Sequence, residues 1–131
     1  MDGYGRILLT QRHPDKHYQL YWECSGGSVL TDESPDDAAV RELFEETGIE
    51  AEISELVQLD IIFGNHAIYY NYLLQRDIEL SSLLLQENEV VDAKFADKSE
   101  YDKMKSEKSI VPPVVERFEK LGIDRLLKTL N

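Results

Sequence analysis

The chain has a single cysteine, no long apolar run and few basic residues. Cys24 stands alone among 131 residues, so an intramolecular disulfide or a cysteine-based zinc cage cannot form. The apolar runs are a handful of residues long, whereas a helix that spans a bilayer needs about 20. Residues 1–6 also lack the basic and then apolar build of a secretory signal. We therefore expect no membrane segment and a cytoplasmic protein.

The balance of charge restricts the partners. Lys and Arg number 14 against 26 Asp and Glu, which gives a formal net charge of −12, and no basic stripe interrupts this excess. Such a surface repels phosphate backbones, so we expect no binding to duplex nucleic acid. A small phosphorylated substrate is compatible only if divalent cations bridge it to the protein, which points to clustered carboxylates. With 42% hydrophobic residues, the chain can bury a core, and we expect one domain over residues 1–131.

Hydrophobic patterning predicts strands interleaved with helices. Ser34 as N-cap, Pro35 at the first helical position and Gly48 as the stop define the clearest helix. Gly64-Asn65 marks a turn between two strands, and Pro112-Pro113 is expected to break the chain. A layered α/β domain follows. The predicted strands cover residues 6–12, 18–24, 52–63, 67–76 and 90–96, and the predicted helices cover residues 34–47, 99–105 and 114–121.

The first of these helices carries like charges on one side. Glu42, Glu45 and Glu46 fall within an arc of about 100° at roughly 100° per residue. Like charges at these spacings repel by a few tenths of a kcal/mol per pair in an isolated helix. A hard cation with oxygen ligands would offset that repulsion. The opposite side is expected to pack against the protein: Val40, Leu43, Phe44 and Thr47.

Residues 27–49, called the box from here on, resemble the signature of the Nudix hydrolase family, G-x5-E-x7-R-E-U-x-E-E-x-G-U, where U is a bulky aliphatic residue. Weaker resemblance to the strand before the box and to a later acidic turn extends over residues 8–12 and 87–95. The resemblance implies a Nudix-type α/β/α sandwich with a mixed sheet, in which the box forms a loop–helix–loop. Every fixed position matches: Gly27, Glu33, Arg41, Glu42, Leu43, Glu45, Glu46, Gly48 and Ile49.

The family hydrolyses a nucleoside diphosphate linked to another moiety and uses Mg²⁺ or Mn²⁺, so the resemblance implies a role for each box residue. Arg41 would hold a box carboxylate in orientation, Glu33 would brace the loop, and Gly48 would end the helix. The proton of the attacking water would go to Glu42, or to Glu87 or Glu89 outside the box. The implied metal ligands are the side chains of Glu42, Glu45 and Glu46 with the carbonyl of Gly27.

Residues outside the box are candidates for substrate binding. Arg12 ends the strand that leads toward the box, where it contacts substrate or forms a surface ion pair. Tyr70 could stack on a nucleobase, since aromatic faces suit that contact, although such residues more often belong to the core. Strand alternation places Tyr70 and Tyr72 on one face and Tyr69 on the other. His66 is expected to be an ordinary loop residue.

One departure from the family pattern opens an alternative. The family commonly has a proline ahead of the double glycine, and residues 23–27 have none. Residues 22–25 are instead similar to isopentenyl diphosphate isomerases, which share the fold and use a metal, a cysteine and a glutamate. Cys24 lies two residues short of the isomerase cysteine, and the box is intact, so we favour a hydrolase and expect Cys24 to be a small buried or semi-buried thiol. A non-catalytic nucleotide-sensing module is a third alternative.

A second departure concerns the start of the chain. The family usually places another strand before residues 5–9, and Met1 leaves no room for it. Either the N-terminal strand is missing, or the sheet is one strand smaller, or a partner subunit covers the edge. An uncovered edge strand favours association, so a homodimer is one expectation.

Overall fold

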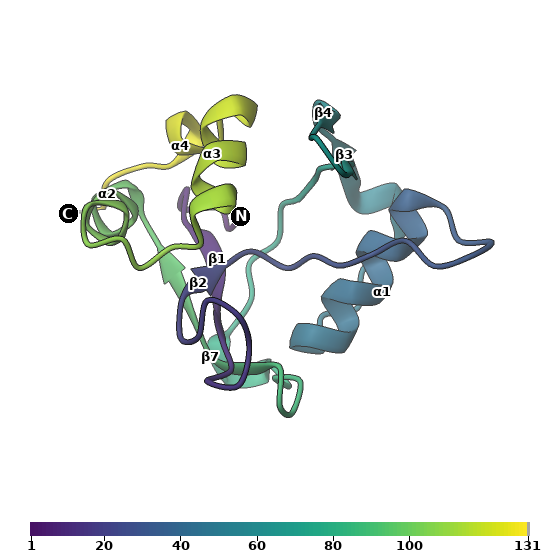
Figure 1. Cartoon of the computed structure of the whole chain (residues 1–131). Coiled ribbons are helices and arrows are strands. Elements are labelled where there is room, and N and C mark those ends of the chain that lie inside the picture. The colour runs from purple at the N-terminus through teal and green to yellow at the C-terminus, as the bar shows by residue number, and fades with distance from the viewer. Residues whose placement is uncertain (131) are drawn as a thin grey trace.

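The computed structural model describes residues 1–130 and arranges them in two groups of elements (Figure 1). One group is a three-stranded sheet with three helices. The other consists of α1 (Pro35–Thr47) and four short strands. The segment 24–33 runs from the first group to the second.

The three-stranded sheet is antiparallel throughout. Its central strand β1 (Ile7–Arg12) lies between β2 (Trp22–Glu23) and β7 (Val90–Ala96). Ile7 and Leu9 are buried, which is the alternation expected of a strand with one covered face. The strands predicted over residues 6–12 and 90–96 are confirmed.

Three helices cover this sheet. They are α2 (Lys98–Ser106), α3 (Pro112–Leu121) and α4 (Ile123–Leu126). Asp97 caps α2, because its side chain accepts a hydrogen bond from the backbone N–H of Glu100 at 2.8 Å. The sheet and the helices share one core: Ile7, Leu9, Ala96, Tyr101, Met104, Ile110, Val111, Val114, Phe118, Ile123 and Leu127.

The start of α3 differs from the prediction. We expected the two prolines to break the chain and the helix to begin at Val114, but α3 begins at Pro112. The first turn of a helix leaves its N–H groups without intrahelical partners, so prolines lacking that group fit there. Gly122, at φ 74°, then ends α3.

Helix α1 has the predicted boundaries. The Ser34 side chain accepts from the backbone N–H of Asp37, and Gly48 ends the helix at φ 78°. Its packing differs from the prediction. Thr47 is fully buried and Leu43 is half-buried, but Phe44 is 49% exposed, so the expectation that Phe44 packs is wrong. The short 3-10 helix η1 (Ile53–Glu55) packs against α1 and is too small to cover all of its apolar side.

The region between the helices forms shorter strands than predicted. β3 (Leu56–Gln58) pairs with β6 (Tyr72–Leu74), and β4 (Ile62–Phe63) pairs with β5 (Ile68–Tyr69) around the predicted Gly64-Asn65 turn. The two ladders are separate because the Asn71 side chain donates to the carbonyls of Asp60 and Tyr69 between them. A further 3-10 helix, η2, covers Leu80–Ser82.

The predicted strand over residues 18–24 also shortens, to Trp22–Glu23. Tyr18 and Leu20 have positive φ, of 53° and 62°, which a strand does not tolerate. The α/β class is confirmed, and all four ladders among residues 1–130 are antiparallel. Parallel pairing is confined there to an isolated bridge between Trp22 and Ile110.

The first residues connect the two groups. The amino group of Met1 donates to the carbonyl of Leu74 at 2.7 Å, and the N–H of Arg76 donates back to Met1 at 3.0 Å. The N–H of Lys128 donates to the carbonyl of Gly5. Residues 1–5 therefore lie between the end of β6 and the last helices. No helix within residues 1–130 is long and apolar enough to cross a membrane.

The first prediction concerns the core. Leu9→Ala should lower the free energy of unfolding by about 3 kcal/mol, because Leu9 is fully buried beneath the helices. The matched control is Leu84→Ala, where the side chain is 75% exposed and the change should stay within about 0.5 kcal/mol. Urea unfolding measures both. Equal losses in the two variants would contradict the position of the core.

Candidate functional site

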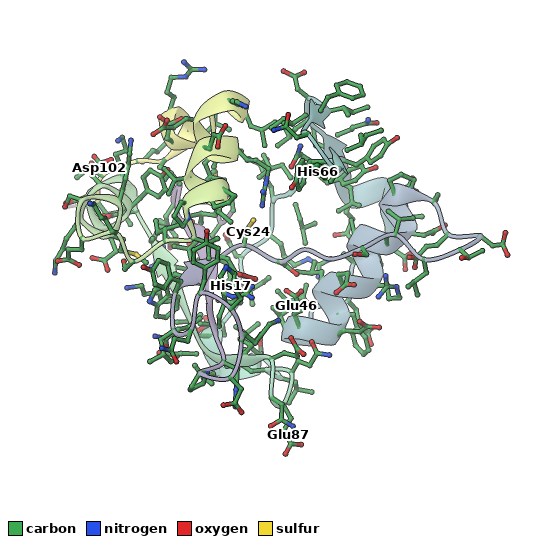
Figure 2. The ribbon with its side chains drawn as sticks, viewed as in Figure 1. His17, Cys24, Glu46, His66, Glu87 and Asp102 are labelled. Carbon is green, nitrogen blue, oxygen red and sulfur yellow. The ribbon has the colours of Figure 1, made fainter. Side chains whose placement is uncertain are left out.

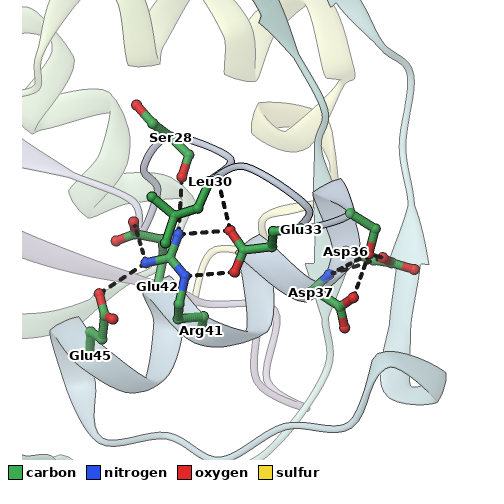
Figure 3. Close-up of polar contacts among 9 residues, drawn as sticks. Ser28, Leu30, Glu33, Asp36, Asp37, Arg41, Glu42 and Glu45 are labelled. Atoms are coloured by element: carbon green, nitrogen blue, oxygen red, sulfur yellow. Dashed lines mark hydrogen bonds and ion pairs between the residues drawn. The ribbon is translucent and has the colours of Figure 1, made fainter.

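Arg41 is the centre of the polar network on α1 (Figure 3). Its guanidinium donates twice to Glu33, from Nε at 2.7 Å and from Nη2 at 3.0 Å. Nη2 also donates to the carbonyl of Ser28 at 3.0 Å. This two-pronged contact with a carboxylate fixes the loop before α1 to the helix, which matches the bracing role predicted for Glu33.

The remaining nitrogen of the Arg41 guanidinium, Nη1, contacts two carboxylates of the helix. Nη1 donates to Glu42 at 3.0 Å and to Glu45 at 3.2 Å. One cation thus offsets part of the repulsion that the spacing of the glutamates creates. Its fork of donors suits this arrangement, because a lysine ammonium could not present donors in the same fixed plane.

Gly27 passes directly against Glu42. A Cβ atom built at Gly27 would clash with the carboxylate of Glu42, whereas one built at Gly26 would meet nothing within 4 Å. The glycine at position 27 is therefore required by close approach rather than by backbone conformation. The structure brings together Gly27 and Glu42, as the predicted metal site requires.

Glu46 lies on the same side, beneath residues 25–26. The Ser25 hydroxyl donates to Oε2 of Glu46 at 2.8 Å, and the Gly26 N–H donates to Oε1 at 3.5 Å. Burial raises the pKa of Glu46 to about 7, and the charges of Glu42 and Glu23 add to the rise. Two carboxylates, those of Glu42 and Glu46, therefore lie beside the double glycine. Arg41 contacts Glu42 but does not reach Glu46.

Glu45 takes a different position from the one predicted. Its side chain is 43% exposed and turns to Arg41. Within residues 1–130 no three Asp, Glu, His or Cys side chains converge closely enough to hold a metal ion. The two carboxylates beside the double glycine, Glu42 and Glu46, nevertheless present the hard oxygen donors that Mg²⁺ and Mn²⁺ prefer.

Arg12 is engaged within the protein. Its Nη1 contacts Glu23 at 2.6 Å, and its Nε donates to the carbonyl of His17 at 2.7 Å. Both charged side chains are about one-fifth exposed. The ion pair that we weighed against substrate contact is therefore formed.

The acidic turn before β7 adjoins the C-terminal end of α1, because the N–H of Gln86 donates to the carbonyl of Glu46 at 3.1 Å. Glu87 is exposed at its tip (Figure 2). Glu89 forms an ion pair with Lys16, and its carbonyl accepts from the N–H of His13. A carboxylate paired in this way must exchange partners before it can accept a proton from water.

The tyrosines of residues 69–72 have different surroundings. Burial raises the pKa of Tyr72, and Asp36 and Tyr70 are near enough to add to the rise. Tyr70 is 41% exposed. The ring of Tyr69 lies under Arg117 of α3, with 4.7 Å between the guanidinium carbon and the ring centroid.

Arg117 was missed by sequence reasoning. No motif surrounds it, and its partner lies 48 positions away on another element. Cys24, by contrast, is a half-buried thiol, within the range that we predicted, and desolvation raises its pKa to about 11. A thiol with that pKa is protonated at neutral pH.

The sequence of the chain matches the model of a known protein family. The model of the NUDIX domain covers residues 1–118. The chain belongs to the NUDIX domain family.

Individual relatives agree. The chain is 33% identical over 110 residues to an uncharacterized Nudix hydrolase of Listeria monocytogenes, a match that covers 82% of this chain and 65% of that protein. It is 30% identical over 95 residues to an 8-oxo-dGTP diphosphatase of Proteus vulgaris, covering 71% and 77% of the two chains. The chain thus spans about two thirds of the length of the Listeria relative.

A solved structure shows the fold. A crystal structure from Deinococcus radiodurans superposes with a TM-score of 0.75 over 92% of this chain and 76% of that one, at 17% identity. The Nudix fold predicted from the box is confirmed by the match of residues 1–118 to the NUDIX domain model.

The approach of Gly27 to Glu42 generates a second prediction. Gly27→Ala should displace the Glu42 carboxylate and weaken Mn²⁺ binding by roughly tenfold or more, as disturbing the surroundings of a metal ligand does elsewhere. Gly26→Ala is the matched control, because open space surrounds that position and the N–H to Glu46 is retained. Titration of both variants with Mn²⁺ measures the difference. If Gly26→Ala weakens binding as much as Gly27→Ala, the close approach is not what positions Glu42.

A third prediction follows from the burial of Glu46. In metal-free protein its carboxyl has a pKa of about 7 when folded and about 4.5 when unfolded, so the folded state binds the extra proton between these values. The free energy of unfolding should therefore fall by up to about 3 kcal/mol as pH rises from 4.5 to 7. Glu46→Gln should lack this fall.

The control for the Glu46 titration is Glu116→Gln, at a side chain that is 67% exposed on α3. This variant should keep the pH dependence of the parent in the same urea unfolding series. If Glu46→Gln shows the same fall as the parent, burial of Glu46 is not its cause.

Proposed function

We propose that this chain is a metal-dependent hydrolase that cleaves a diphosphate linkage by attack of water on phosphorus. The substrate class is a nucleoside diphosphate linked to another moiety, or a nucleoside triphosphate. The observation that carries the proposal is the placement of Glu42 and Glu46 beside the double glycine, with Arg41 and Ser25 holding them.

The donor set supports Mg²⁺ or Mn²⁺ as the cofactor. Glu42 and Glu46 would hold the ion, the Gly27 carbonyl is adjacent, and Glu45 reaches the same side if it leaves Arg41. Such an ion, when bound, neutralises charge on the phosphate oxygens and acidifies water. A protein with net charge −12 needs that neutralisation to admit a polyphosphate.

The remaining residues of the box would hold the metal-binding carboxylates in position. Arg41 restricts the rotamers of Glu42 and Glu45, and Glu33 in turn restricts Arg41. The proton of the attacking water would go to Glu42 in the box or to Glu89, after Glu89 releases Lys16. Arg12 and Tyr70 stay as proposed substrate contacts, with Arg12 released from Glu23 when it acts.

The Proteus relative carries the name 8-oxo-dGTP diphosphatase, which supports a nucleoside triphosphate among the substrates to be tested. The Listeria relative, similar over most of this chain, is named only as a Nudix hydrolase. The identity of the nucleoside and of the leaving group is therefore a matter for screening.

The isomerase alternative is disfavoured by the state of Cys24. An isomerase of this fold would use a thiol to move protons, whereas Cys24 is half-buried and its pKa is raised to about 11. A non-catalytic module is disfavoured because all four glutamates of the box are present. A homodimer remains a prediction.

The fourth prediction tests the function directly. The protein should hydrolyse at least one member of a panel of nucleoside triphosphates, dinucleotides, ADP-ribose-like conjugates and inorganic tripolyphosphate in Mg²⁺ or Mn²⁺. Excess EDTA should abolish turnover, and Glu46→Gln should lower it by roughly 10²-fold, as for the loss of one strong electrostatic contribution. Phosphate or nucleotide release by chromatography measures all three.

Cys24→Ser separates hydrolase from isomerase within the same assay. Hydrolysis should survive this substitution nearly unchanged, because no step of the proposed reaction uses the thiol. Turnover of isopentenyl diphosphate by the parent, lost in Cys24→Ser and accompanied by no hydrolysis of any panel member, would overturn the proposal.

A further inference from the structure

Arg117 and Tyr69 form a stacked pair between the two groups of elements. The guanidinium of Arg117 lies 4.7 Å from the centroid of the Tyr69 ring, so a face of the cation is over the ring. Arg117 belongs to α3, in the core group, and Tyr69 to β5, in the other (Figure 1). The pair thus bridges elements that are otherwise joined by few contacts.

The hydrogen-bonding edges of Arg117 are unused. Arg117 is half-buried, yet among residues 1–130 it has no ion pair and no hydrogen bond to a side chain or carbonyl. This is unusual in a chain with 26 acidic residues. Four of the other arginines each contact a carboxylate: Arg6, Arg12, Arg41 and Arg76.

The position of Arg117 relates it to the box. Arg117 is near enough to Cys24 for its positive charge to lower the pKa of the thiol. The negative charges of Glu23 and Glu46 raise the same pKa. Cys24 is followed by Ser25 and Gly26, which hold Glu46, and Cys24 and Glu46 both lie centrally in the molecule (Figure 2). A molecule whose phosphates lie beside Glu46 could extend along this segment toward Arg117.

The surroundings of Tyr69 suit a planar apolar group rather than a phosphate. Tyr69 is 38% exposed, and the residue opposite it on the same face of the hairpin is the aliphatic Ile62, which is half-buried. Arginine stacks on planar groups with its faces while its N–H edges donate to ring oxygen and nitrogen acceptors. The exposed side of this pair therefore offers stacking area and unused donors together.

We propose that Arg117 and Tyr69 bind the nucleobase of the substrate, Arg117 by stacking on the base with the face that Tyr69 does not cover, and Tyr69 by holding the guanidinium plane. This inference rests on the proposed function, because it assumes that the phosphates of the same nucleotide lie beside Glu42 and Glu46. It adds a specificity element that the box does not contain.

The fifth prediction tests this pair by calorimetric titration in Mg²⁺. The probes are the α,β-methylene analogues of ATP, GTP, CTP and UTP, with methylenediphosphonate as the probe without a base. The parent should bind at least one nucleotide analogue more tightly than methylenediphosphonate. Arg117→Ala should weaken that nucleotide about tenfold, the size expected for one stacking contact to a base, and leave methylenediphosphonate unchanged.

Conservative variants separate recognition from folding. Tyr69→Phe keeps the ring and should bind as the parent does, whereas Tyr69→Ala should lose affinity for the nucleotide alone. Arg117→Lys keeps the charge but lacks the planar face, so it should weaken the nucleotide and decides the question if Arg117→Ala fails to fold. Lys120→Ala, at an exposed residue of α3 that pairs with Glu116, is the matched control and should change nothing.

Two results would overturn the inference. The first is unchanged nucleotide binding in Arg117→Lys and Tyr69→Ala, or an equal loss for methylenediphosphonate, which would make Arg117 a phosphate contact. The second is a parent that binds no nucleotide more tightly than methylenediphosphonate. Hydrolysis of tripolyphosphate that requires metal would still uphold the proposed function in that case, so the two failures are distinguishable.

Discussion

The contact between Arg41 and the carboxylates around it is the interaction on which the site depends. Glu33, Glu42 and Glu45 all lie within 3.2 Å of one guanidinium, in a chain of net charge −12. Without that cation the loop before α1 would lose its attachment to the helix, and the glutamates would repel one another. Arg41 does not reach Glu46, however. The negative charge that stays uncompensated is therefore located beside residues 25–27, which is where a bound cation would lower the electrostatic energy most.

Local signals in the sequence predicted the elements whose ends are set by local chemistry. The boundaries of α1 follow from Ser34, Pro35 and Gly48, which act on their own turn of the helix. Strand β7 has the predicted bounds, residues 90–96. The strands within residues 52–76 were not predicted correctly, because the length of a strand depends on the partner that pairs with it. Asn71, whose side chain binds two carbonyls between the ladders, interrupts pairing in a way that its own sequence context does not reveal.

The candidate site shows the same division: its local arrangement was predicted from the sequence, and its contacts with distant residues were not. The spacing of the box placed Gly27, Glu33, Arg41 and Glu42 together, because a helix turn and one loop determine their positions. Which carboxylate pairs with which cation was not predictable. Glu45 turns to Arg41, and the pairing of Glu89 with Lys16 depends on two loops that are 73 positions apart. The same limit hid Arg117, since only the packing of α3 against the β4–β5 hairpin brings it to Tyr69.

Helix α1 is only partly covered by other elements, yet contacts with neighbouring segments fix the positions of its carboxylates. Phe44 is half exposed, so packing alone does not hold α1. Polar contacts hold its C-terminal end instead. Ser25 and Gly26 bind the Glu46 side chain, and the N–H groups of Leu84 and Gln86 donate to the carbonyls of Thr47 and Glu46. The first pair continues from β2, which belongs to the sheet, and the second pair leads into β7 of that same sheet. The C-terminal end of α1 is thus held to the core through two segments that meet at Glu46.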